Sequence, residues 1–87
     1  MATVREDLEE RLKELQTHSD RLKVKLHLGR ADLRDRFEEA QGKIEKVRGE
    51  LKRFGEQAKE PGEEIRKNLG TLLDDAGKLL RRVRETL

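Results

Sequence analysis

The chain has 87 residues, of which 46% are charged and 2% aromatic, and it contains no cysteine. That length allows one domain, residues 1–87, with a small core, and the lack of cysteine excludes disulfides and thiolate metal sites. The net charge is only +2 and both signs are spread evenly along the sequence. Because nucleic-acid surfaces need clustered cations, nucleic acid is the partner that we expect least.

The distribution of apolar residues bears on where the protein acts. No apolar run approaches the roughly 20 residues that cross a bilayer, and the first residues lack the apolar stretch of a signal peptide. We therefore expect a cytoplasmic protein, with peripheral contact to a membrane as the alternative.

The first predicted helix begins with a capping signal. Thr3 and Glu6 have the spacing of a capping box, in which each side chain binds the other residue's backbone N–H. An apolar stripe follows at helical spacing, and a serine interrupts it: Val4, Leu8, Leu12, Leu15, Ser19, Leu22 and Leu26.

The middle of the chain carries a regular heptad pattern. Apolar residues step by four and three in what we call the seam: Leu33, Phe37, Ala40, Ile44, Val47, Leu51, Phe54 and Ala58. This is the pattern of a helix that buries one narrow face against another helix. We expect the seam to be the surface through which copies of the chain self-associate.

Residues 28–32 leave two arrangements open. Gly29 could end one helix and Asp32 could cap the next. No proline, serine or asparagine marks a loop there, and one glycine costs a helix only about 1 kcal/mol. We favour one long amphipathic helix over about 3–59, in an oligomeric coiled coil or helical bundle. The alternative is a monomeric antiparallel three-helix bundle with a break near Gly29.

The last predicted helix follows the only proline. A turn is expected at 59–62, because proline disfavours helical geometry before it and suits the start of a helix. The helix over about 62–86 has a wide apolar face: Ile65, Leu69, Leu72, Leu73, Ala76, Leu79, Leu80 and Val83. Such a width is typical of a helix docked onto two others. With Arg81, Arg82 and Arg84 beside it, the face also suits contact with lipid.

Residues able to perform chemistry are sparse. His18 and His27 are nine residues apart, so on a helix they point in opposite directions and share no metal ligand site. Most carboxylates lie beside bases, as Glu9 does beside Lys13, which is typical of a solvated helix face. No phosphate-binding loop or nucleophile motif is present. We therefore expect no enzyme, no catalytic residue, no metal, no cofactor and no small-molecule substrate.

One segment shows a family resemblance. Residues 22–39, Leu-Lys-Val-Lys-Leu-His-Leu-Gly-Arg-Ala-Asp-Leu-Arg-Asp-Arg-Phe-Glu-Glu, resemble a group of small bacterial coiled-coil proteins described as apolipoprotein-like, in which tryptophan usually stands at the position of Phe37. The resemblance covers about residues 20–40 and implies a helical protein with an amphipathic C-terminal helix. Because that group also has alanine at the position of Gly29, it favours a continuous helix. It implies no activity and no functional residue.

Together these patterns predict a non-enzymatic structural or interaction protein that self-associates through the seam as a homo-oligomer. The alternative is reversible binding to a membrane or lipid surface through residues 63–87. Non-specific nucleic-acid binding comes third, because only the basic pI of about 9.1 supports it.

Overall fold

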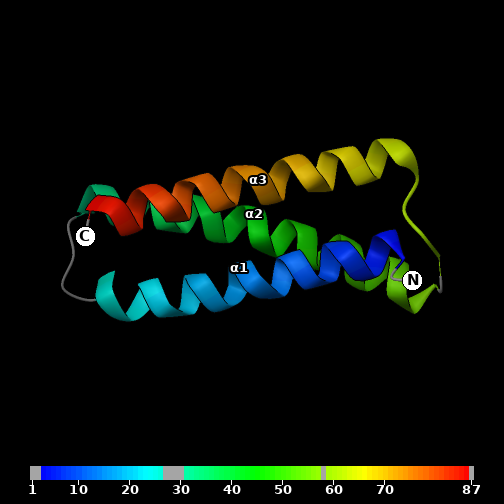
Figure 1. The fold of residues 1–87 in the computed structure, drawn as a ribbon, viewed down its shortest axis with the longest axis horizontal. Helices are drawn as coiled ribbons and strands as arrows, with labels where there is room; N and C mark the ends of the chain where they lie inside the picture. The colour runs from blue at the N-terminus through cyan, green and yellow to red at the C-terminus, as the bar shows by residue number, and fades with distance from the viewer. Residues whose placement is uncertain (1–2, 27–30, 58, 87) are drawn as a thin grey trace.

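The computed structural model describes residues 3–26, 31–57 and 59–86. It contains three helices, α1 (Val4–Leu26), α2 (Ala31–Glu56) and α3 (Glu63–Thr86), in an elongated bundle of 42 × 20 × 20 Å (Figure 1). The helices α1 and α3 run in the same direction and α2 runs in the opposite one. The predicted all-α helical bundle and its C-terminal helix over about 62–86 are thereby confirmed.

The preferred arrangement, one helix over about 3–59, is wrong. The first helix ends at Leu26, and α2 begins at Ala31 and packs along α1 in the opposite direction. Folding back buries the leucines of α1 against the seam, and each fully buried leucine contributes about 1.5–3 kcal/mol. That gain exceeds the cost of interrupting one helix. The position of the predicted break, Gly29, lies outside the described residues.

The start of α1 is capped from two sides. Thr3 Oγ1 accepts a hydrogen bond of 3.1 Å from the Glu6 N–H, as the capping signal predicts. The Arg5 N–H donates to Glu60 Oε2 at 3.0 Å, and the Arg5 guanidinium donates to the Lys59 carbonyl at 3.1 Å. An anionic side chain from the segment before α3 thus binds the N-terminus of α1, where the helix dipole favours negative charge.

The connection between α2 and α3 coincides with the predicted turn. The Lys59 N–H donates to the Phe54 carbonyl at 2.9 Å, the hydrogen bond that closes a Schellman-type helix end. Pro61 is buried, and α3 begins two residues later at Glu63. Proline at this place prevents the helical backbone from continuing, so a new direction begins here.

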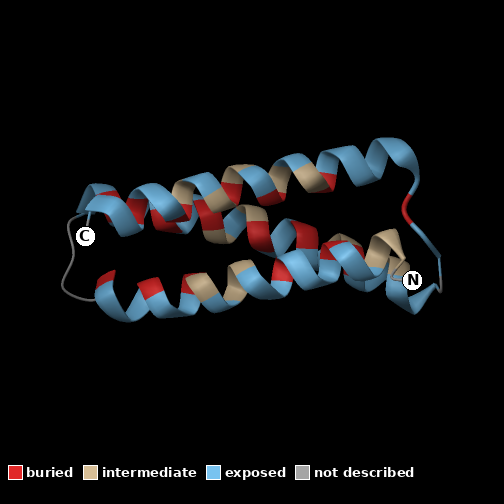
Figure 2. Cartoon of the chain, in the orientation of Figure 1, coloured by how far each residue is buried: buried red, intermediate tan, exposed pale blue. Residues whose placement is uncertain are grey.

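The three helices enclose one hydrophobic core, visible as the inward-facing red segments in Figure 2. Its buried members come from all three helices: Leu8, Leu12, Leu22, Leu26, Leu33, Phe37, Ala40, Ile44, Val47, Leu51, Leu69, Leu73, Ala76, Leu80 and Val83. The third helix packs against both others, and Leu72 and Leu79 add partly buried contacts to the same core. The wide face of α3 is therefore explained by two helical neighbours.

We expect Ala31→Pro to leave stability almost unchanged. Ala31 is exposed and is the first helical residue of α2, a position at which proline is well tolerated. In one continuous helix the same change would cost about 3 kcal/mol. Thermal unfolding followed by circular dichroism measures the difference. Lys46→Pro, at an exposed position inside α2, is the control and should show the full loss. Equal destabilisation by both changes would argue against this helix boundary.

Candidate functional site

The seam is buried inside the three-helix bundle that a single chain forms. Six of its residues are buried in the bundle: Leu33, Phe37, Ala40, Ile44, Val47 and Leu51. Phe54 is partly exposed, and Ala58 lies outside the described residues. Because α1 and α3 of the same chain cover these side chains, a second copy could contact them only in place of one of those helices.

The apolar face of α3 is covered in the same way. Five of its residues are buried: Leu69, Leu73, Ala76, Leu80 and Val83. Leu72 and Leu79 are partly buried, and only Ile65, with 39% of its surface exposed, is largely open. A closed bundle therefore offers lipid little apolar surface on this helix.

The serine that interrupts the α1 stripe forms a polar contact inside the bundle. Ser19 is 3% exposed, and Gln41 Nε2 donates to its hydroxyl oxygen at 3.4 Å. The neighbouring His18 Nε2 has no hydrogen-bond partner in the part of the chain described. Ser19 and His18 thus do not form the bonded pair that a nucleophile and its base require.

Folding brings together cations that the sequence spreads evenly. The C-terminal ends of α1 and α3 lie at the same end of the bundle (Figure 1). Residues 18–26 and 78–86, which we call the basic end, contain two carboxylates and seven cations: Arg21, Lys23, Lys25, Lys78, Arg81, Arg82 and Arg84. No ion pair joins any of these cations to another described residue. Counting charge along the sequence missed this cluster, because it depends on α1 and α3 being parallel.

The helix dipole accounts for only part of the basic end. Cations in the last turn of a helix interact favourably with its C-terminal carbonyl groups, and the effect fades beyond that turn. Arg21, Lys78 and Arg81 lie before the last turns of their helices, which end at Leu26 and Thr86. The helix dipole therefore does not explain why these cations lie close together, whereas binding of a negatively charged ligand would explain it.

A hollow lies between α1 and α3 beside the basic end. It has a volume of about 390 Å³ and is lined by Arg11, Glu14, Leu15, His18, Leu73, Asp74, Gly77, Lys78 and Arg81. Gly77 lines the hollow on the α3 side. A Cβ atom at that position would lie 3.6 Å from Leu15 Cδ2. An ion pair of 2.5 Å between Arg11 and Asp74 joins the two helices at the hollow.

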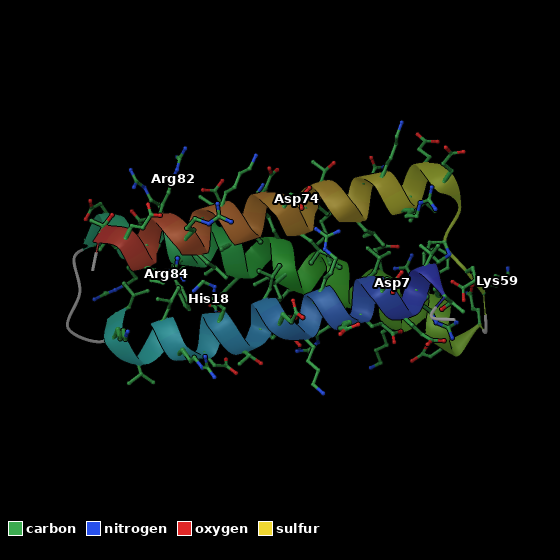
Figure 3. The ribbon with its side chains drawn as sticks, in the orientation of Figure 1. Asp7, His18, Lys59, Asp74, Arg82 and Arg84 are labelled. Atoms are coloured by element: carbon green, nitrogen blue, oxygen red, sulfur yellow. The ribbon has the colours of Figure 1, made fainter. Side chains whose placement is uncertain are left out.

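The surroundings of His18 disfavour protonation of its ring. Burial of the ring lowers the pKa of His18 from its ordinary 6.5, and the positive charges of Arg84 and Arg21 lower it further. Figure 3 shows Arg84 of α3 and His18 of α1 next to each other in the space between these helices. Arg84 and Arg21, two cations of the basic end, thus influence the protonation of this ring through their charge.

This geometry predicts how stability depends on pH. Because the folded protein disfavours His18 protonation, the unfolded chain binds more protons than the folded protein once the pH falls below 6.5. The contribution of His18 to stability is complete above that pH and declines below it. We expect urea unfolding midpoints at pH 7.5 and 5.5 to differ less in His18→Gln than in the parent chain. An identical difference in both proteins would contradict the assignment.

Other site types are missing from the described ranges. Residues 3–26, 31–57 and 59–86 contain no group of three or more His, Asp or Glu side chains that could hold a metal ion. None of the three helices is long and apolar enough to span a membrane. Comparisons with protein families, with curated proteins and with solved structures find no match to this chain. The resemblance of residues 22–39 to apolipoprotein-like coiled-coil proteins consequently stays a prediction.

Proposed function

We propose that this protein is a non-enzymatic interaction protein whose basic end binds reversibly to an anionic membrane surface. The observation that carries the proposal is the group of seven cations and two carboxylates on the α1 and α3 segments of that end, without ion pairs to described residues. Near a surface of anionic lipids each Lys or Arg contributes about 1 kcal/mol. Several such cations at one end of the bundle therefore give useful, salt-sensitive affinity.

The opposite end of the same two helices has the reverse charge. Residues 3–11 and 59–68 contain seven carboxylates and five cations. The start of α2, residues 31–39, lies at the basic end and adds four carboxylates and two cations, so nine cations stand against six carboxylates there. This remaining positive excess, with the net negative charge at the opposite ends of α1 and α3, orients the bundle as it approaches an anionic surface. This mode of binding leaves the core closed, because it requires no apolar side chain of α3 to leave the bundle.

Sedimentation with vesicles tests the proposal. We expect the protein to bind phosphatidylcholine vesicles that contain phosphatidylserine, and not vesicles of phosphatidylcholine alone, at low ionic strength. Replacing Arg81, Arg82 and Arg84 by glutamine should weaken binding by about a hundredfold, from about 1 kcal/mol per charge. Added salt should release the protein, because exposed charges are screened.

A variant with the same net charge controls for simple electrostatics. Lys52, Arg66 and Lys67 are exposed and lie away from the basic end, and replacing them by glutamine should leave most vesicle binding intact. Equal losses in both triple variants, or no binding at low salt, would overturn the proposal. Tighter binding to duplex DNA than to vesicles at the same salt concentration would replace the membrane by nucleic acid.

Self-association through the seam stays a second proposal. The specific observation in its favour is a hollow of about 490 Å³ between α1 and α2, lined by Ser19 and Gln41, where a polar pair stands at the contact between the two helices. A helix held less tightly is easier to exchange with a second copy. Light scattering on a sizing column decides, because the chain has a mass of 10.2 kDa and an exchanged dimer has twice that mass. A single-chain mass at all concentrations would remove this proposal.

A further inference from the structure

We propose that the groove between α1 and α3, at the basic end, is a binding site for a phosphate group held by the guanidinium groups of Arg21, Arg81 and Arg84 beside His18. The inference rests on the proposed function for the source of the phosphate, because it names a lipid phosphomonoester as the headgroup recognised. The site itself is defined by local geometry, so free phosphate can test it separately.

The arrangement of the arginines supports phosphate. Arg81 and His18 line the same hollow from α3 and α1. Figure 3 shows Arg84 next to His18, and Arg21 follows His18 by about one turn of α1. The guanidinium group presents several N–H donors in a plane and matches phosphate oxygens in pairs. Three such groups from two helices can approach one tetrahedral anion from different directions.

None of these arginines is already engaged by a carboxylate. The ion pairs that the structure describes involve other cations, and Arg21, Arg81 and Arg84 form none with a described residue. Like charges held together repel one another and raise the free energy of the empty site. A bound anion reduces this repulsion and is attracted by all three charges. A single exposed arginine has no such repulsion to relieve, so it binds the anion less strongly.

The hollow has room for the ligand and includes opposing charges. Its volume is about 390 Å³, more than a phosphate group occupies. The charged or titratable groups facing His18 and the hollow are Glu14 and Arg21 from α1 and Asp74, Lys78, Arg81 and Arg84 from α3. Arg11 compensates Asp74 directly, so Glu14 is the main group opposing an anion.

Nuclear magnetic resonance of the His18 ring provides a local readout. The sequence contains two histidines, and His18→Gln identifies the signal of His18. We expect inorganic phosphate to shift this signal in a saturable manner and to raise the pKa of His18, because the anion offsets the arginine charges. Sodium chloride at matched ionic strength should produce neither effect.

Three substitutions with different expected directions make the test specific. Arg84→Gln should weaken phosphate binding by at least about tenfold, as expected for one lost hydrogen bond to a charged group. Glu14→Gln should strengthen binding, because it removes the opposing carboxylate. Arg66→Gln changes the net charge as Arg84→Gln does but lies at the far end of α3, and it should leave binding unchanged. Equal losses in Arg84→Gln and Arg66→Gln, or no saturable shift at His18, overturn the site.

Vesicles then identify the source of the phosphate. Phosphatidic acid presents a phosphomonoester, and phosphatidylserine presents a phosphodiester. The site therefore predicts tighter binding to vesicles with phosphatidic acid. Arg84→Gln should reduce this binding more than it reduces binding to vesicles with phosphatidylserine. Binding of free phosphate without binding to either vesicle supports the site and refutes the membrane function. Equal binding to both vesicles, weakened to the same extent for each by Arg84→Gln and not by Arg66→Gln, together with no saturable shift at His18, supports the membrane function and refutes the site.

Discussion

Val47→Asp is expected to unfold the protein. Val47 has no exposed surface and lies near the middle of α2, where side chains of α1 and α3 surround it. A carboxylate at this position would be buried without a partner, a change among those that cost more than 4–5 kcal/mol. The net stability of small proteins starts at about 5 kcal/mol, so this cost is comparable to the whole. Far-ultraviolet circular dichroism at 25 °C should therefore show loss of most of the helical signal.

The control for this change places the same residue on the surface of the same helix. Lys52→Asp introduces aspartate at an exposed position of α2, and it should retain the helical signal with a small change in melting temperature. If Val47→Asp remained as helical as Lys52→Asp at all protein concentrations, the valine could not lie in the core. The two variants thus separate burial from the low helix propensity of aspartate.

Leu80→Ala is expected to lower the free energy of unfolding by about 2–5 kcal/mol, the usual range for leucine in a core. Leu80 is completely buried between the helices, whereas the adjacent Leu79 is only partly buried. Leu79→Ala removes the same atoms and should cost clearly less, because fewer contacts and less apolar surface are lost. Urea unfolding of the two variants, compared with the parent chain, measures the difference.

The order of these two losses tests which face of α3 is internal. Sequence spacing places Leu79 and Leu80 in neighbouring columns of one wide apolar face, and it does not rank them. In the bundle, the column of Leu73, Leu80 and Val83 points into the core. A larger loss in Leu79→Ala than in Leu80→Ala would mean that α3 is rotated about its axis relative to this packing.

The local features of the fold could be predicted from the sequence, because each depends on residues close together in the chain. Thr3 and Glu6 marked the start of α1, and the proline marked the change of direction before α3. The interruption between α1 and α2 could not be predicted in the same way. It depends on the leucines of α1 finding the seam of α2, and helical periodicity is identical whether that partner lies in the same chain or in another.

The basic end was missed for a related reason. In the sequence, Arg21 and Arg84 are separated by most of the chain, and the stretch around each holds only three or four cations. The two segments come together only because α2 reverses the chain direction and α3 reverses it again, so that α3 runs in the same direction as α1. Likewise, nothing near His18 in the sequence reveals that an arginine of α3 lies beside it. Spatial clusters of this kind depend on topology, which composition does not encode.

The hydrogen bond between Arg5 and Glu60 has a consequence for the order of folding. It joins positions 55 residues apart in the chain, so closing this loop carries a larger entropic cost than forming either hairpin of adjacent helices. Hairpins form from nearby segments first. The first turn of α1 then acquires its carboxylate partner only after α2 and α3 have set their directions. That turn consequently belongs to the last part of the bundle to become native, although it leaves the ribosome before α2 and α3.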